Sequence, residues 1–169
     1  DFPAGGVLEN GPAIPVVAGT YLVTYDNSIG EYSFDAPPIP TIAIVGAGVG
    51  GWPGDPGNVG PIDTNQMTTT DGGVTYTLNG LVVVGGEAKF RQNNAWSVNW
   101  GDSTASGNIE LVAGTYDITF MPAATNSDGG TGLFTFKTAG TNDIVKTNDP
   151  AFLSTKGFST ASFKVYPNP

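Results

Sequence analysis

The side chains best suited to bind a ligand in this sequence are aromatic, basic and amide groups that fall in one stretch of the chain. All three tryptophans lie between positions 52 and 100, and the segment 89–102 adds Lys, Arg, Gln and Asn. The C–H face of a sugar ring packs on an indole ring, while sugar hydroxyls hydrogen-bond to basic and amide side chains. These residue types favour a glycan-binding site. The alternative is that the tryptophans fill the core of a small β-sandwich.

Composition argues against other kinds of active site. The chain has no His and no Cys, which excludes Ser-His-Asp hydrolases, cysteine nucleophiles, disulfides and zinc sites with imidazole or thiolate ligands. The four Glu and eleven Asp are then the only acid–base candidates, and most of the Asp stand in turn contexts. A glycosidase needs two carboxyls about 5–10 Å apart across a cleft. We therefore expect no enzyme activity, no catalytic residues, no cofactor and no specific metal site.

Charge and hydropathy narrow the choice of partners. Six basic residues against fifteen acidic ones give a net charge of −9. Nucleic acids and anionic membranes are bound mainly through Lys and Arg, so neither is expected as a partner. The longest apolar run, residues 42–49, is much shorter than the about 18–20 residues that span a bilayer. No membrane insertion is expected.

A glycine pattern at residues 46–51 invites a nucleotide-binding interpretation. It reads G-x-G-x-x-G and follows the apolar run 42–45, as in dinucleotide-binding folds. That fingerprint works because its last glycine opens a helix whose N-terminus holds the pyrophosphate. Here Trp52-Pro53-Gly54-Asp55-Pro56 follows, a sequence that cannot be helical. We expect a flexible Gly-rich loop and no nucleotide.

The elements that must position these side chains are short β-strands. Gly and Pro together make up 25 + 13 = 38 of 169 residues, and no long segment has uninterrupted helical periodicity. Several short segments alternate apolar and polar residues between Gly, Asn and Asp turns, the pattern of half-buried strands. We therefore expect an all-β, immunoglobulin-like antiparallel β-sandwich, with tight turns at Asp71-Gly72 and Asn79-Gly80. The expected strands are 41–45, 74–78, 88–91, 96–100, 115–120 and 133–137.

Strand alternation predicts which side chains of the segment 89–91 reach the surface. Phe90 points inward, which turns Lys89 and Arg91 together to the open face. A loop residue has no strand to bury it, so Trp52 is the aromatic most exposed by its context. Lys89, Arg91 and Trp52 are thus available to a ligand.

The next strand, 96–100, is less regular. Val98 is expected in the core, which places Trp100 in the core as well and Asn99 on the open face. Alternation alone gives Trp96 the same side as Val98. A turn at 93–94 precedes it, however, and a bulge or strong twist there would swing Trp96 outward.

The sequence contains an internal repeat. Residues 14–25 match residues 109–120 at seven of twelve positions, at an offset of 109 − 14 = 95 residues. An aromatic strand follows each copy, Tyr32-Ser33-Phe34 in one case and Phe134-Thr135-Phe136 in the other. The offset is close to the about 100 residues of an immunoglobulin-like sandwich.

The repeat predicts how the chain is divided. Residues 1–36 are expected to be the C-terminal half of a preceding sandwich repeat, and residues 41–138 a complete module. A Pro-rich junction lies at 37–40 and a linker at 139–162. Two strands cannot bury a core alone, so residues 1–36 must lean on the complete module, on a neighbouring chain or on a part outside this sequence.

The sequence closes on Phe-Lys-Val-Tyr-Pro-Asn-Pro at residues 163–169. This segment resembles the opening strand of the C-terminal sorting domain of type IX secretion substrates. The resemblance implies a protein that is secreted or displayed on the cell surface.

Residues 41–138 carry a set of short motifs in a fixed order: G-W, M, D-G-G-x-x-Y, K-F-R, W and N-W-G. This order is similar to the repeated modules of SusE/SusF-type outer-membrane starch-binding proteins, and residues 1–36 look like the second half of another copy. The resemblance implies a non-catalytic β-sandwich that holds an α-glucan, as a polysaccharide or oligosaccharide, on two aromatics and a basic side chain. By position these are Trp52, Trp96 and Lys89, with Arg91, Asn94 and Asn99 as further hydrogen-bond partners.

A structural role is the main alternative. Tandem modules would form a stalk, adhesin or extracellular filament, in which the tryptophans are buried and residues 1–36 join another module or chain by strand addition. A binding appendage of a glycoside hydrolase or protease is compatible with either role.

Overall fold

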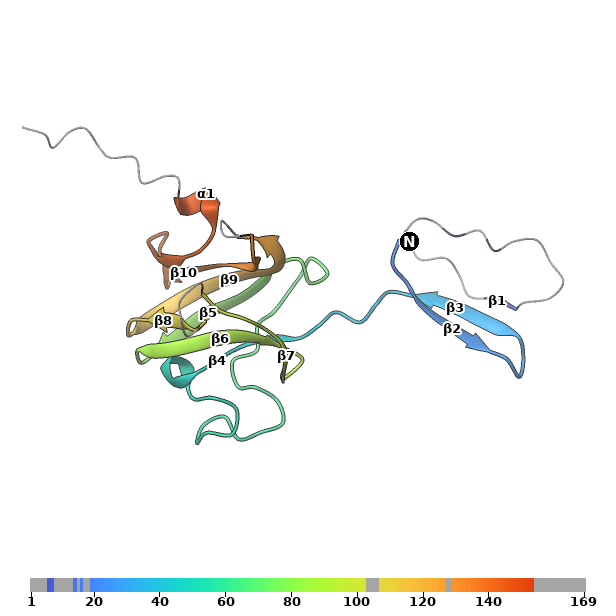
Figure 1. Ribbon diagram of the computed structural model, residues 1–169, viewed down its shortest axis with the longest axis horizontal. Helices are drawn as coiled ribbons and strands as arrows, with labels where there is room; N and C mark the ends of the chain where they lie inside the picture. The colour runs from blue at the N-terminus through green and yellow to red at the C-terminus, as the bar shows by residue number, and fades with distance from the viewer. Residues whose placement is uncertain are drawn as a thin grey trace, which may run out of the picture. The chain divides into compact units, whose positions relative to one another are not determined.

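The computed structural model describes residues 6–7, 14, 16, 19–102, 107–126 and 129–153 (Figure 1). The chain divides into two compact units, residues 1–39 and 40–169, which we call unit 1 and unit 2. The division falls within the Pro-rich junction at 37–40. The sorting segment predicted at 163–169 lies outside the described residues, as does the part of the predicted linker from 154 to 162.

Unit 1 is a small antiparallel sheet. It contains β1 (Gly6–Val7), β2 (Leu22–Asp26) and β3 (Glu31–Asp35), in the order β1-β3-β2. The turn between β2 and β3 is closed by a hydrogen bond from the Gly30 amide to the Asp26 carbonyl, at 2.8 Å. The Asp26 carboxylate also accepts from the backbone and hydroxyl of Ser28.

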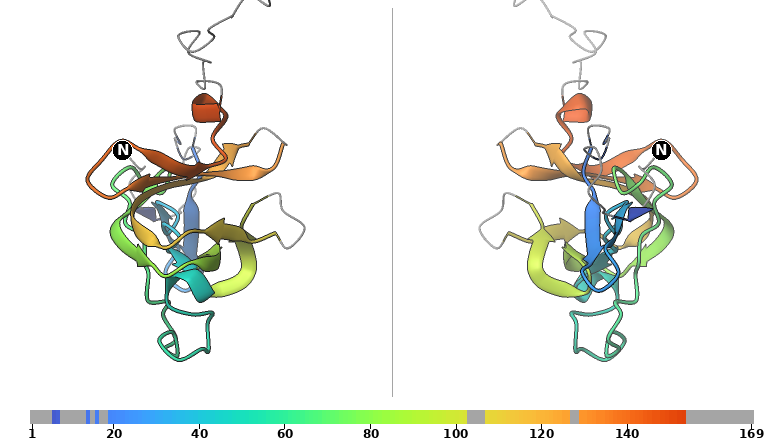
Figure 2. Two further views of the ribbon diagram at one scale, coloured as in Figure 1. Left: turned by 90° about the vertical axis from the view of Figure 1, so that its left-hand side faces the viewer. Right: turned by 90° about the vertical axis from the view of Figure 1, so that its right-hand side faces the viewer.

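Unit 2 is an antiparallel β-sandwich whose two sheets form separate layers (Figure 2). One sheet has the order β11-β10-β9-β5, and the other has the order β4-β6-β7 with β8 also paired to β6. The strands β7 and β8 pair with successive parts of β6, because Trp100 lies opposite Phe90 and Ile109 lies opposite Ala88. The predicted all-β fold is confirmed. The strands are β4 (Ile42–Val45), β5 (Tyr76–Val83), β6 (Gly86–Gln92), β7 (Ala95–Trp100), β8 (Ile109–Leu111), β9 (Gly114–Thr125), β10 (Thr131–Thr138) and β11 (Ile144–Thr147).

The core of unit 2 lies between the two sheets and is rich in aromatic rings. Phe90 of β6 stacks on Phe120 of β9, with ring centroids 4.1 Å apart and an interplanar angle of 8°. Phe136 and Trp100 pack against this pair from β10 and β7. The inward residues alternate along β6 and β9, as period-2 patterning requires. The fully buried members include Ile42, Ile44, Tyr76, Ala88, Phe90, Ile109, Ile118, Phe120, Phe134 and Phe136.

The sheet continues past residue 138, so the predicted linker at 139–162 is wrong for residues 144–147. These form β11, which pairs with β10, and a short helix α1 (Pro150–Leu153) follows. The Asn148 side chain accepts from the Phe134 amide and donates to the Gly132 carbonyl, which ties the end of β11 to β10. The sequence of this edge strand does not alternate, because the apolar residues Ile144 and Val145 are adjacent. Both are exposed.

The expected tight turn at Asn79-Gly80 is also wrong. Both residues lie inside β5, where the pairing with β9 shifts register between Leu78 and Leu81. Gly80 has φ 69°, a left-handed conformation that suits a bulge, and its amide donates to the Asp117 carboxylate at 2.9 Å. Among the residues that the structure describes, no helix is long and apolar enough to cross a membrane.

Candidate functional site

The outer face of the β4-β6-β7 sheet is covered by a loop, residues 46–66, which we call the covering loop. It lies on the side of this sheet away from β9 and β10 (Figure 1). It begins at the G-x-G-x-x-G segment, where Gly46 and Gly51 exchange two backbone hydrogen bonds of 3.1 and 2.9 Å around the one-turn 3-10 helix η1 (Ala47–Val49). No α-helix follows, so the expected Gly-rich loop is confirmed. A Cβ on Gly46 would collide with the Glu87 backbone, which explains the glycine there.

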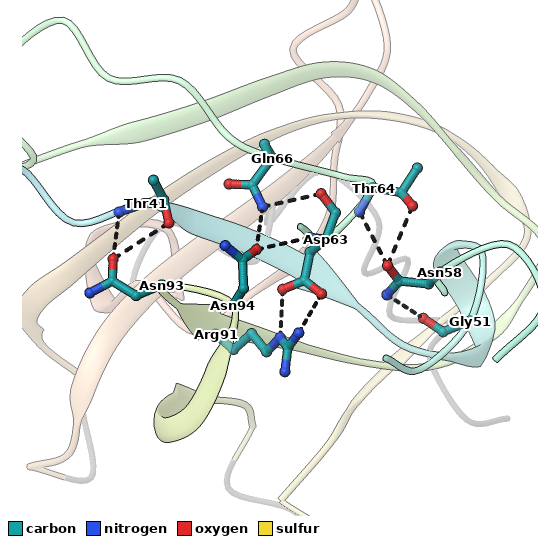
Figure 3. Close-up of polar contacts among 9 residues, drawn as sticks. All are labelled: Thr41, Gly51, Asn58, Asp63, Thr64, Gln66, Arg91, Asn93 and Asn94. Atoms are coloured by element: carbon teal, nitrogen blue, oxygen red, sulfur yellow. Dashed lines mark hydrogen bonds and ion pairs between the residues drawn. The ribbon is translucent and has the colours of Figure 1, made fainter. Parts of the chain in front are cut away.

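Hydrogen bonds within the covering loop fix the backbone of Trp52. The Trp52 amide donates to the Asp55 carboxylate at 2.9 Å, and the Asp55 amide donates to the Trp52 carbonyl at 2.8 Å. The buried Asn58 donates to the Gly51 carbonyl and accepts from Thr64 (Figure 3). These contacts order a loop that is rich in Gly and Pro.

A buried ion pair joins the covering loop to β6. Nε and Nη2 of Arg91 donate to the two carboxylate oxygens of Asp63, each at 2.5 Å, and both side chains are almost completely buried (Figure 3). Arg91 leaves the sheet on the outer face, as its parity with Phe90 predicts. It is covered by the loop, however, so the expected exposure of Arg91 is wrong. This bidentate pairing of the Arg91 guanidinium with Asp63 holds the covering loop against β6.

The β6–β7 turn holds the covering loop through its two asparagines. Asn93 and Asn94 have φ of 52° and 55°, the left-handed values that a two-residue hairpin turn requires and that Asn tolerates. The Asn94 side-chain oxygen accepts from the Asp63 amide at 2.8 Å and from Gln66 at 2.9 Å (Figure 3). The Asn93 side chain accepts from the Thr41 amide. Asn94 is therefore engaged within the protein.

Trp52 and Trp96 meet on this face. Their ring centroids are 6.0 Å apart with an interplanar angle of 46°. Trp96 is 46% exposed while Trp52 is half-buried, so the prediction that Trp52 is the most exposed aromatic is wrong. The Arg91 guanidinium carbon lies 5.0 Å from the centroid of the Trp96 ring, a cation–π contact. The two tryptophans therefore form a tilted aromatic surface supported by Arg91.

An irregularity in β7 turns Trp96 outward, which is the outcome that the turn at 93–94 was expected to allow. The pairing of β6 and β7 shifts register between Arg91 and Gln92, so β7 carries extra residues after the turn. Regular pairing resumes at Asn99 and Trp100, and Trp100 packs against Phe120 in the core as expected. Val98 lies in the irregular stretch and is exposed, so its predicted core position is wrong.

Lys89 and Asn99 extend the same face. The Lys89 ammonium donates to the Asn99 side-chain oxygen at 3.2 Å, and the Asn99 amide nitrogen donates to the Trp96 carbonyl at 2.9 Å. Asn99 is exposed and Lys89 partly so. This chain of contacts links the basic group to the backbone of the exposed tryptophan.

The six residues predicted for the site thus lie on one face but differ in availability. Trp52, Trp96, Lys89 and Asn99 are the reachable members, whereas Arg91 and Asn94 hold the covering loop. Sequence reasoning missed the partners of those two, Asp63 and Gln66, and the buried Asn58. The one available signal was that Arg91 is the sole arginine of the sequence. If other parts of the protein cover an arginine in a strand, its buried charge needs a carboxylate partner.

In the part of the chain that the structure describes, no three acidic side chains come together in a group that would hold a metal ion. Comparison of the sequence with protein-family models and with curated proteins, and of the fold with solved structures, gives no match.

Proposed function

We propose that unit 2 is a non-catalytic carbohydrate-binding module that holds a glucan, with a starch-like α-glucan favoured. The observation that carries this proposal is the pair formed by Trp52 and Trp96, whose rings lie 6.0 Å apart on an outer face. Tryptophans placed side by side on an outer face offer stacking surfaces for consecutive sugar rings. The same residues are those implied by the similarity to SusE/SusF-type modules.

The tilt of the two rings favours a curved ligand. An interplanar angle of 46° presents two faces that are not coplanar. A chain that bends between successive sugars, as an α-linked glucan does, follows such a surface better than a flat ribbon does. Lys89 and Asn99 stand on the same face and supply donors for sugar hydroxyls.

The buried Arg91–Asp63 pair also supports the proposal, because it fixes the elements that carry the two tryptophans. It anchors the covering loop that carries Trp52 to the strand that precedes Trp96. A site whose aromatic groups are held by such a support loses little conformational entropy on binding. The location that we propose is extracellular, secreted or on the cell surface, and it rests on the resemblance of residues 163–169 to a sorting domain.

Affinity electrophoresis tests the proposal. The full chain, with a net charge of −9, migrates toward the anode in a native gel. Glycogen or amylopectin in the gel should retard it, and hydroxyethyl cellulose should retard it less. Trp52→Ala and Trp96→Ala should each weaken binding by about tenfold, equivalent to about 1.4 kcal/mol, which is the scale of an aromatic contact.

The matched control is Tyr25→Ala, which removes an exposed aromatic ring from unit 1. Its mobility should equal that of the unmodified chain in every gel, and circular dichroism should show that the tryptophan variants keep their fold. Unchanged mobility of the full chain in glycogen and amylopectin would contradict the proposal. So would equal retardation of the chain with and without the two tryptophans.

A further inference from the structure

The hairpin β2–β3 of unit 1 has the same register as the hairpin β9–β10 of unit 2. In unit 1, Leu22 lies opposite Asp35 and Tyr25 lies opposite Tyr32. In unit 2, Asp117 lies opposite Lys137 and Phe120 lies opposite Phe134. The first strands therefore correspond at an offset of 117 − 22 = 95 residues, and the second strands at 137 − 35 = 102. This first offset equals that of the sequence repeat.

The aromatic rings of the two hairpins are arranged alike. Tyr21 and Phe34 meet edge to face at 5.7 Å and 86°, as Tyr116 and Phe136 do at 6.2 Å and 85°. The next pair is equally similar, with Tyr32 and Phe34 at 5.7 Å and 80°, and their counterparts Phe134 and Phe136 at 5.7 Å and 76°.

The entry to each hairpin is alike as well. Each begins with a tyrosine whose hydroxyl lies over the glycine two residues earlier. A Cβ placed on Gly19 would stand 3.0 Å from the Tyr21 oxygen, and one placed on Gly114 would stand 2.8 Å from the Tyr116 oxygen. Together with the ring pairs, this gives unit 1 the inner face of a sandwich sheet.

The two inner faces differ in what covers them. In unit 2, Ile118 and Phe120 are fully buried, because Phe90 of the opposite sheet stacks on Phe120. Their counterparts in unit 1, Val23 and Tyr25, are 56% and 51% exposed. A face that carries core aromatic residues and is open to this extent marks an interaction surface.

Unit 1 also has an unpaired sheet edge at the matching place. In unit 2, β9 pairs with β5 along the edge away from β10. In the described part of unit 1 the sheet ends at β2, and no strand pairs with that edge. An open edge beside an open apolar face accepts an added strand and a second layer together.

We propose that this surface is covered by the first half of another copy of the repeat, carried on the same polypeptide ahead of Ile14. This half corresponds to residues 41–108: a strand like β5 pairs with the edge of β2, and a sheet like β4, β6 and β7 lies over Val23 and Tyr25. Connectivity supports one polypeptide. In unit 2, β8 leads into β9 through Val112 and Ala113, and Ile14 and Val16 stand at the positions of the β8 residues Ile109 and Leu111.

The other occupants fit less well. The inner faces of the described sheets of unit 2 are occupied, since the two sheets cover each other. A second copy of unit 1 offers no ring equivalent to Phe90 in its described residues, because Phe90 belongs to the sheet that unit 1 lacks. The inference is independent of the proposed glucan site, which lies wholly in unit 2.

The test is an extended chain in which residues 41–108 are placed directly before residues 14–169. Amide hydrogen exchange is followed by mass spectrometry for residues 22–35 in the original chain, in the extended chain, and in residues 14–169 alone, which lack β1 as the extended chain does. Burial of this hairpin in a complete sandwich should slow its exchange on the order of 100-fold. A second extended chain carries Tyr25→Phe and Tyr32→Phe. These changes give unit 1 the same two rings as Phe120 and Phe134, which lie against the corresponding sheet in unit 2.

Paired variants of the extended chain separate a specific fit from a general effect. Val23→Asp, on the inner face, should restore fast exchange of residues 22–35. Thr24→Asp, on the opposite face of the same strand, should leave the protection in place. Fast exchange in both extended chains would overturn the proposal. So would sedimentation of the original chain as a dimer whose residues 22–35 are already protected, because the occupant would then be a second copy.

Discussion

The hairpins β2–β3 and β9–β10 have the same register and the same arrangement of tyrosine and phenylalanine rings, yet one is buried and the other is exposed. The pairing and the contacts between neighbouring rings are alike in the two hairpins although the opposite sheet covers only one of them. Burial comes from elsewhere, because Phe90 covers Phe120 and belongs to the other sheet. The same local structure therefore contributes very different amounts to stability in the two units.

The largest expected effect of this difference is at the matched positions 120 and 25. Phe120→Ala removes a fully buried ring and should lower the free energy of unfolding of unit 2 by about 3–5 kcal/mol. Tyr25→Ala removes a half-exposed ring from unit 1 and should lower the free energy of unfolding of unit 1 by less than about 0.5 kcal/mol, which hydrogen exchange of residues 22–35 measures. Urea denaturation followed by tryptophan fluorescence measures unit 2 alone, since all three tryptophans lie in it. If the two variants lose similar amounts of unfolding free energy, the two hairpins do not differ in how much their burial contributes to stability.

A smaller effect is expected at the tyrosines that begin the two hairpins. The buried Tyr116 hydroxyl donates to the Val112 carbonyl at 3.0 Å, so Tyr116→Phe removes one buried hydrogen bond and should cost about 1 kcal/mol. Tyr21→Phe is the matching substitution in unit 1. It should leave the urea midpoint of unit 2, detected by tryptophan fluorescence, unchanged. A shift of that midpoint by Tyr21→Phe would mean that the two units unfold together.

The same contrast explains how much of the fold could be predicted from the sequence. Alternation in 88–91 correctly predicted that Phe90 faces the core, and the segment 115–120 was correctly predicted as a strand. The repeat predicted the correspondence of the hairpins. Edge strand β11 was missed because its apolar residues, Ile144 and Val145, are adjacent and do not alternate with polar ones. Neither is buried, so the core imposes no alternation on this strand.

The candidate site was predictable only in part. Trp52, Trp96 and Lys89 followed from residue type, loop context and the motif order. The Arg91–Asp63 pair could not be predicted, because its members are separated by 28 residues and Asp63 lies in a loop whose path has no period. The outward turn of Trp96 was anticipated, whereas the exposure of Val98 was not. Both depend on how many residues the β7 irregularity inserts, which the turn sequence alone does not specify.

The smallest expected effect is a pH dependence that unit 2 has and unit 1 lacks at one pair of matched positions. Asp117 corresponds to Leu22, and its carboxylate accepts from the amides of Gly140 and Gly80, each at 2.9 Å. These two hydrogen bonds, the Gly140 one first, hold the pKa of Asp117 below its ordinary value of 3.8. A carboxyl with a lower pKa in the folded state stabilises the fold above pH 3.8, and that contribution is lost as the pH falls through the folded pKa.

Asp117→Asn removes this titration and keeps the size of the side chain. The urea midpoint of unit 2 should therefore fall less between pH 5 and pH 2 in the variant than in the unmodified chain, with tryptophan fluorescence as the readout. Asp71, whose pKa is lowered chiefly by its hydrogen bond from the Thr75 amide, is present in both proteins, so its contribution cancels in the comparison. The matched change Leu22→Asn in unit 1 should leave the pH dependence of unit 2 unaltered. If Asp117→Asn has the same acid sensitivity as the unmodified chain, the hydrogen bonds from the Gly80 and Gly140 amides do not contribute to the stability of the longer hairpin. Burial by the opposite sheet then accounts for the difference between the units.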